Sequence, residues 1–287
     1  MIKHINMRHT AIIMLMIFNL DLIQAQDIDT IHSAKSHIFS LYTGFVKYIE
    51  RDDAMSPFKY RGHSSPVELS YRYNSLKSRH IFYANFDHAK LTSSIPNYEN
   101  AGLNHYVLST NIQMGYSYLR KAFSLLKFQS NLYLGGEIGS LLNLRQHAYI
   151  DNNEFLMMDQ FNSLGFKAQL EKRFTNRKQL AFFSINIPVV SYVLMGDTYN
   201  FYVGEKTDPL IDFGGNALMY LAKKGDFVSF NKLVYFNTDF SFIQFIGNHF
   251  GIECKYSLRY YKYCQFQNLN YSKNLQSQFL IGITGKL

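Results

Sequence analysis

The chain of 287 residues has no tryptophan, two cysteines and five prolines, and only 17% of it is Asp, Glu, Lys or Arg. Two cysteines exclude a small scaffold held by several disulfides. The charged fraction lies below the roughly 25% that is typical of soluble domains. No block of Lys and Arg accompanies the formal net charge of +8, so nucleic acid is not an expected partner.

The chain is instead rich in apolar and aromatic side chains. Hydrophobic residues make up 47% of it, and the aromatics consist of 25 Phe and 22 Tyr. The mean hydropathy is nevertheless slightly negative, so polar and apolar residues must be finely interleaved. Because this much apolar surface favours a packed fold, we exclude a disordered chain.

The first residues have the pattern of a secretory signal peptide. Lys3 and Arg8 give a positive start, residues 11–20 are apolar, and Ile23-Gln24-Ala25 resembles a cleavage site. An apolar run of about ten residues is too short for a membrane-spanning helix, which needs about twenty. We therefore predict a signal peptide over 1–25 and a short periplasmic segment over 26–36. No later run is long and apolar enough to predict a transmembrane helix.

Strict alternation of apolar and polar residues dominates the rest of the chain. In 67–74, Val, Leu and Tyr alternate with Glu, Ser, Arg and Asn, and 106–118 and 250–260 follow the same rhythm. A period of two places the two sets on opposite faces of a β-strand. The alternating segments are about ten to fifteen residues long, and a tilted strand needs about nine to eleven residues to cross a bilayer. Residues 37–287 are therefore predicted to form a transmembrane antiparallel up-and-down β-barrel.

We predict about ten strands, with eight or twelve as alternatives. The connections alternate in length, as expected when short turns face the periplasm and long loops face outward. The strands are expected at 37–48, 65–75, 79–90, 104–119, 125–143, 160–173, 179–195, 227–243, 249–263 and 276–287. The short turns are expected at 75–78, 120–124, 174–178 and 244–248, and the extracellular loops near 49–64, 91–103, 144–159, 196–226 and 265–275.

The last strand resembles the C-terminal signal that is read by the outer-membrane assembly machinery. Phe279, Ile281, Ile283 and Leu287 share one phase, although Leu287 stands where Phe is usual. Together with the signal ending in Ala25-Gln26 and the Tyr- and Phe-rich barrel, this pattern resembles outer-membrane β-barrel proteins of Bacteroidota. The resemblance implies location in the outer membrane of a Gram-negative bacterium and no particular activity. It also implies contact with outer-membrane lipid, periplasmic chaperones and the barrel-assembly machinery.

Placing the apolar phase toward lipid leaves a charged phase that points into the barrel. A lumen of about ten strands is narrow, because eight strands leave only enough room for side chains. Unpaired charges would be costly there, so we expect the acidic and basic members to pair and plug the lumen, with a narrow solute channel as an alternative. The predicted lumen residues are Glu68, Arg72, Asp87, Lys127, Glu137, Arg145, Lys167, Glu171, Asp239, Glu253, Lys255 and Arg259.

A hydrolase at the outer rim is the alternative reading of the function. Omptin proteases are ten-stranded barrels with acidic residues and an Asp/His pair at the rim, and Asp87 and His105 offer those residue types here. Asp87 and His88 cannot serve one site, because neighbours on a strand point to opposite faces. His63 and Ser64 offer the base and nucleophile of the kind that outer-membrane phospholipases and lipid A deacylases use. The omptin spacing and the rest of the lipase pattern are missing.

No metal or cofactor is expected. The ten His residues are scattered without ligand spacing. Cys254 and Cys264 lie ten residues apart along one strand and its exit, a span of over roughly 30 Å that no disulfide bridges. The glycines of 135–139 interrupt a strand rather than precede a helix, so they favour barrel curvature over phosphate binding.

We favour a non-enzymatic surface barrel that presents its loops to a glycan or protein partner. The loop over 196–226 combines glycine with aromatic side chains, and exposed aromatics on a loop are suited to making contacts. The alternative is that the same aromatics fold back and cap the barrel. The candidate contact residues are Tyr199, Phe201, Tyr202, Phe213 and Tyr220.

Overall fold

A computed structural model of the protein describes residues 35–52, 58–93, 106–125, 130–148, 154–174, 178–195, 225–266 and 269–287. These residues form β-strands joined by turns, as the alternation predicts. Within these ranges, no helix is long and apolar enough to cross a membrane. The strands are β1 (Ser36–Asp52), β2 (Lys59–Ser64), β3 (Val67–Asn74), β4 (Ser78–Ser93), β5 (Tyr106–Leu125), β6 (Ser130–Ala148), β7 (Glu154–Arg173), β8 (Gln179–Met195), β9 (Asp226–Val228), β10 (Leu233–Ile246), β11 (Phe250–Phe266) and β12 (Leu269–Lys286).

The described strands make one antiparallel up-and-down sheet of twelve strands. β2 and β3 both pair with β1 and β4, so they share one position, and Ser65 and Pro66 interrupt it. Pro66 has no N–H to donate to a neighbouring strand. β9 and β10 share a second position, because both pair with β8. The twelve strand segments therefore occupy ten positions around the barrel wall, and the predicted ten-stranded barrel is confirmed.

The sheet closes on itself where the last strand meets the first. β12 pairs with β1 from Ile38 opposite Lys286 to Asp52 opposite Ser272. Beyond this ladder, the N–H of His37 donates to the carbonyl of Leu287 at 3.1 Å, and the N–H of Leu287 donates to the carbonyl of His37 at 2.9 Å. Closure satisfies the backbone groups of both edge strands, which an open sheet would leave unpaired.

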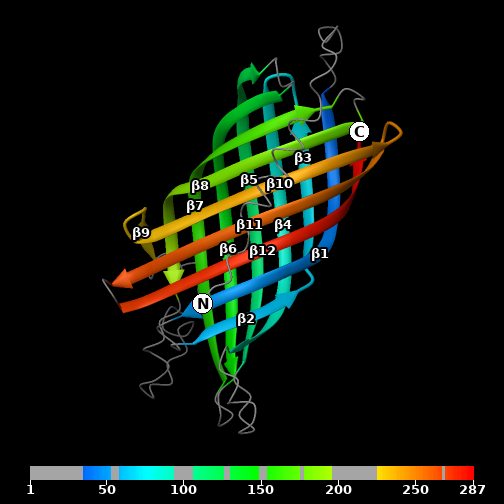
Figure 1. Ribbon diagram of the computed structural model, residues 1–287. Helices are drawn as coiled ribbons and strands as arrows, with labels where there is room; N and C mark the ends of the chain where they lie inside the picture. Colours follow the sequence, from blue (N-terminus) through cyan, green and yellow to red (C-terminus); the bar gives the residue numbers. More distant parts are fainter. Residues whose placement is uncertain are drawn as a thin grey trace, which may run out of the picture.

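The barrel has two unlike ends (Figure 1). At the turn end lie the start of β1, the C-terminus and the short connections, such as 75–77 between β3 and β4 and 247–249 between β10 and β11. Gly247 takes φ 71° in the latter turn, a conformation that suits glycine. The opposite end, called the loop end below, carries the connections that leave β1, β4, β6, β8 and β11.

The two faces of the barrel wall differ in polarity, in the phase that the sequence indicates. Along β1, Phe39 and Leu41 are about half exposed on the outside, whereas Ser40 and Tyr42 are buried inside. The same alternation continues around the barrel, so apolar side chains cover its outer surface and polar side chains fill its interior. This is the arrangement that a lipid-facing barrel requires.

Several predicted boundaries are wrong, because the strands continue beyond the expected length. Of the expected loops, 49–64, 91–103, 144–159 and 265–275 each contain strand residues, and the turn expected at 120–124 belongs to β5. The inward phase explains the extension: Glu50 on β1 and Arg145 on β6 remain buried beyond the predicted strand ends. Where polar residues occupy both faces of a strand, the alternation disappears and the sequence resembles a loop. The backbone hydrogen bonds between the strands nevertheless continue. Most of the loop over 196–226 lies outside the described residues.

The outward phase can be tested with an arginine at two heights. Leu69 is 56% exposed and pairs with Leu41 in the middle of the apolar band. Leu69→Arg should lower the free energy of unfolding in lipid vesicles by about 2–4 kcal/mol, the cost of Arg at a bilayer midplane. Denaturant titrations of the protein in vesicles measure this difference.

The matched control is Leu258→Arg. Leu258 faces outward opposite Ser277, which lies opposite Lys47 nearer the loop end. Arg is tolerated near a bilayer interface, so the cost there should fall to about 0–1 kcal/mol. Equal costs at Leu69 and Leu258 would contradict the proposed height of the apolar band.

Candidate functional site

The polar interior is the candidate site, and its middle holds a network of buried charges. Arg72 Nη2 lies 2.5 Å from Glu253 Oε1, and the side chain of Glu253 is fully buried. Arg72 also donates to the hydroxyl of Tyr42 at 3.2 Å. Ser40 and Thr284 donate to the second oxygen of Glu253, each at 3.4 Å. Because β1, β3, β11 and β12 supply these groups, the pair joins the two sides of the closing seam.

A second pair lies beside the first and branches. Lys255 Nζ lies 2.7 Å from Glu68 Oε1 and 3.8 Å from Asp239 Oδ1. Arg259 approaches the other oxygen of Glu68 at 3.8 Å. The hydroxyl of Ser257 donates to Asp239 at 2.6 Å. Each carboxylate therefore has a cation and at least one neutral donor, which is what a buried ion pair needs to offset its desolvation.

Glu137 on β6 forms the third centre of this network. Lys167 Nζ lies 2.7 Å from Glu137 Oε2. The amide of Asn186 donates to the other oxygen at 2.6 Å, and the hydroxyls of Ser117 and Tyr83 donate at 2.8 and 3.0 Å. We call the eight charged residues at this level the central network. They are Glu68, Arg72, Glu137, Lys167, Asp239, Glu253, Lys255 and Arg259.

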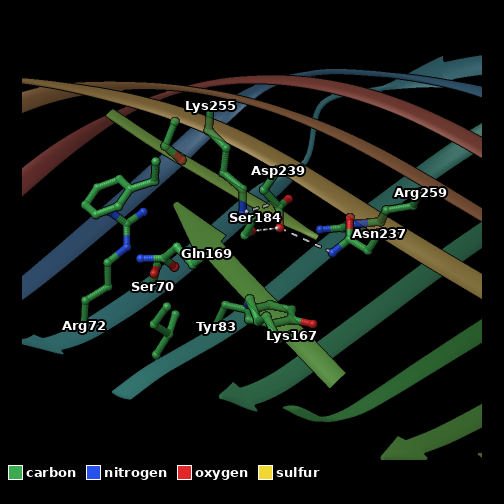
Figure 2. A pocket seen from close by; sticks show the side chains of 13 residues that line it. Ser70, Arg72, Tyr83, Lys167, Gln169, Ser184, Asn237, Asp239, Lys255 and Arg259 are labelled. Atoms are coloured by element: carbon green, nitrogen blue, oxygen red, sulfur yellow. Dashed lines mark hydrogen bonds and ion pairs between the residues drawn. The ribbon is translucent and has the colours of Figure 1, made fainter. Parts of the chain in front are cut away.

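A cavity of about 40 Å³ lies inside the central network. Figure 2 shows Arg72 on one side, Arg259 and Asn237 on the other, and Asp239 and Lys255 between them. A space of this size holds only a few water molecules. Arg72 Nη1 and Arg259 Nε have no hydrogen-bond partner among the described residues, so polar groups are available to such water. The cavity is too small for a solute of ordinary metabolite size.

At the turn end, a further ion pair lies inside the barrel. Arg79 on β4 lies 2.9 Å from Glu171 on β7 and also donates to the hydroxyl of Tyr133. The guanidinium lies 4.2 Å from the centroid of the Tyr133 ring. Arg173 reaches the other oxygen of Glu171 at 3.0 Å, but its side chain is 59% exposed. Arg79 therefore spans the lumen, whereas Arg173 lies at its edge.

At the loop end, Arg145 on β6 is fully buried between two carboxylates. Arg145 Nη1 lies 3.1 Å from Glu50, and Nη2 pairs with Asp159. The amide of Asn274 donates to Glu50 at 3.2 Å. This group joins β1, β6, β7 and β12 across the lumen.

Asp87 is bound by neutral partners instead. Its carboxylate accepts hydrogen bonds from Tyr48 and, at 3.2 Å, from Asn111. Asp87 and both partners are buried, so this carboxylate is held inside the barrel and not presented at a rim.

Apolar clusters occupy the interior toward both ends of the barrel. Near the turn end are Ile81, Leu119 and Tyr133 on one side, and Leu180, Phe182 and Ile243 on the other. Toward the loop end, β1, β2, β4 and β5 supply one cluster that includes Tyr48 and Tyr60. A second cluster includes Phe161, Tyr261 and Tyr263 from β7 and β11. Water-excluding packing thus lies on both sides of the central network.

The predicted lumen residues lie inside the barrel in the structure, with one exception. Lys127 lies outside the described residues. Sequence reasoning missed three partners, namely Arg79, Glu50 and Asp159. Glu50 and Asp159 fall in segments expected to be loops, and Arg79 opens a strand next to a turn. The continued inward phase of β1, in which Val46, Tyr48 and Glu50 are all buried, is the signal that could have found Glu50.

Of the residues proposed for a rim hydrolase, Ser64 and Asp87 both face the interior, whereas His63 lies on the opposite face of the wall. His63 is exposed on the outer face and stacks on Phe45 with 5.5 Å between the ring centroids. Ser64 is buried and points inward, so His63 cannot act as its base. Asp87 is inward and His88 exposed, as the alternation requires. His105 lies outside the described residues, and so do the loop aromatics Tyr199, Phe201, Tyr202, Phe213 and Tyr220.

In the described part of the chain, no group of three or more His, Cys, Asp or Glu side chains is arranged to hold a metal ion. Cys254 and Cys264 are free thiols with intermediate exposure.

Among solved structures, the chain is similar to the outer membrane protease OmpT of Escherichia coli. The TM-score is 0.52 at 6% sequence identity, with 92% of this chain and 99% of that chain covered. The fold is that of an outer-membrane β-barrel. At this identity the likeness concerns the fold alone. The translocator domain of the autotransporter NalP from Neisseria meningitidis matches with a TM-score of 0.38 at 9% identity, covering 88% of each chain. No protein-family model and no curated protein matches the sequence.

Breaking one central ion pair should destabilise the barrel strongly. Arg72→Met leaves the fully buried Glu253 carboxylate without its cation, which should cost about 3–5 kcal/mol in the free energy of unfolding. The double variant Arg72→Met with Glu253→Gln should recover much of the loss, because no uncompensated charge remains. Unfolding titrations in detergent or vesicles give the full double-mutant cycle.

Arg173→Met provides the control. Arg173 pairs with a carboxylate too, but its side chain is 59% exposed, so its removal should cost less than about 1 kcal/mol. An additive cycle at Arg72 and Glu253, with no recovery in the double variant, would show that the pair does not couple.

Proposed function

We propose that the protein is a closed outer-membrane barrel of a Gram-negative bacterium that presents its loop end to a surface partner and catalyses no reaction. The observation that carries the proposal is the filled interior, in which the central network leaves a cavity of only about 40 Å³. Apolar clusters lie on both sides of that network. A barrel filled in this way suits a role at its surface better than the passage of solutes.

The outward side of the barrel supports a membrane location. A band of exposed apolar side chains surrounds the wall, including Leu41, Leu69, Phe86 and Ile281 at 51–56% exposure. Leaving such side chains in water would be costly, whereas lipid accommodates them. The short turns, the start of β1 and the C-terminus share one end, which in outer-membrane barrels is the periplasmic one. The loop end would then face the exterior.

The location implies further partners of the chain. Export through the predicted signal over 1–25 would be followed by contact with periplasmic chaperones and the barrel-assembly machinery. The final strand supports this route, since Phe279, Ile281 and Ile283 all face outward on β12. A surface glycan or another membrane protein is the partner class that we propose for the loop end.

The closed lumen leads to a prediction for ion conduction. Wild-type protein inserted in a planar bilayer should give no stable current steps, because fixed charges and apolar side chains fill its interior. A general porin in the same bilayer serves as the positive control. Stable, reproducible current steps from the wild-type protein would contradict the closed lumen and favour the narrow solute channel.

The role of the long loop is tested separately by deletion. A variant lacking residues 200–222 keeps the described strands, so it should fold and shift on heating in gels as the wild type does. Affinity capture from outer-membrane extracts should recover at least one partner with the wild type and not with the deletion variant. Identical partner sets for the two folded proteins would exclude binding through this loop.

A further inference from the structure

The outer face carries an organised set of cations on the side toward the loop end. Lys47 on β1 lies directly opposite His63 on β2, and His63 lies directly opposite Lys90 on β4. All three side chains are exposed on the outside of the barrel. Directly opposite residues on neighbouring strands have Cβ atoms about 4.5–5.5 Å apart. Three neighbouring strands thus present basic residues at the same height.

A second row of cations runs two outward positions closer to the loop end. Lys262 on β11 lies opposite Lys273 on β12, Lys273 lies opposite Arg51 on β1, and Arg51 lies opposite Lys59 on β2. Arg61 on β2 lies between the two rows and is exposed. We call this set the outer basic band. It consists of Lys47, Arg51, Lys59, Arg61, Lys90, Lys262 and Lys273.

Four of the seven residues of the band have no carboxylate partner in the described strands. In the described strands, no carboxylate forms an ion pair with Lys47, Lys59, Arg61 or Lys90. Like charges that lie opposite one another on a sheet are destabilising. The carboxylates that could have balanced them point into the barrel, where they are buried: Glu50, Glu68, Asp87, Glu137, Asp159, Glu171 and Glu253.

The band begins where the apolar surface ends. On β1 the outward side chains pass from Phe45 directly to Lys47, and on β4 they pass from Phe86 through His88 to Lys90. One step along an outward face is about 6.6 Å. The other border of the apolar surface is aromatic instead: His37 bonds the hydroxyl of Tyr71 at 2.8 Å, and His80 bonds that of Tyr116 at 2.8 Å. The two borders are therefore chemically different.

We propose that the outer basic band binds the phosphate groups of a membrane glycolipid in the leaflet at the loop end. Phosphate oxygens accept charge-assisted hydrogen bonds from Lys and Arg, and the planar guanidinium of Arg61 can bind two of them. The acyl chains of the same lipid would lie on the apolar surface just below, over Phe45 and Phe86. One ligand thus accounts for the cations, for their mutual repulsion and for their position against the apolar border.

The proposal rests on the membrane location proposed above but not on the closed lumen. Only a leaflet rich in phosphate-bearing lipid supplies anions along the whole band at once. A free anion would meet single exposed lysines and bind weakly, whereas a lipid adds the contact of its chains.

The experiment measures lipid binding to the full-length purified protein in neutral detergent. The probe is a hexa-acyl glucosamine disaccharide with two phosphates, and its dephosphorylated form is the second probe. Lys47→Gln/Arg61→Gln/Lys90→Gln should bind the phosphorylated probe about 100-fold more weakly than the wild type. Both proteins should bind the dephosphorylated probe equally and weakly.

A matched triple variant at the turn end controls for the loss of three charges. Lys77→Gln/Arg120→Gln/Lys178→Gln also removes two exposed lysines and one exposed arginine, and it should bind as the wild type does. Equal loss in both triple variants, or unchanged binding in the Lys47 variant, would overturn the proposal. Displacement of the lipid by inorganic phosphate at millimolar concentration would overturn the lipid as the source of the phosphate. Lipid binding and ion conduction are measured separately. A failure of the lipid-binding proposal can therefore be told apart from a failure of the closed-lumen proposal.

Discussion

The structure depends on closure of the sheet between β1 and β12. Backbone groups on an open edge would have no partner inside a lipid phase, and each would cost several kcal/mol. The ladder from Ile38–Lys286 to Asp52–Ser272 removes that cost, and the backbone bonds between His37 and Leu287 complete it. Once the ring is closed, the period of two assigns every side chain either to the wall's exterior or to its interior, so register and polarity are fixed together.

Closure confines the inward side chains to a narrow space, and this makes pairing of charges necessary. The lumen of a ten-stranded barrel is little wider than that of an eight-stranded one, so Glu253, Lys255 and Arg72 cannot keep separate hydration shells. Buried ion pairs often add little net stability, but removing one partner is costly. The network therefore specifies one arrangement of the interior more than it strengthens the fold, and the apolar clusters toward each end shield it from bulk water.

The alternation of residues was sufficient to predict the barrel, its ten strand positions and the side of the wall on which Glu68, Lys167 or Arg259 lies. The bounds of β8 were also predicted correctly, because turn-like residues flank it and its apolar phase is clear. The extensions at the loop end were not predictable in this way, since polar residues occur on both faces there. Pairing was beyond the sequence altogether: Arg79 and Glu171 lie 92 positions apart, and only the curvature of the barrel brings them to 2.9 Å.

The distribution of charge carries an argument that neither composition nor fold provides alone. Seven carboxylates and seven cations are buried in the described residues, so the buried charges cancel. The excess positive charge of the chain must therefore lie elsewhere, and part of it forms the basic rows outside β1, β2 and β4. A net charge of +8 is thus no sign of an anion-selective lumen. The electrostatic field of the basic rows acts outside the barrel wall and not in the lumen. In the proposed membrane location, phosphate groups of lipids are the abundant anions on that side.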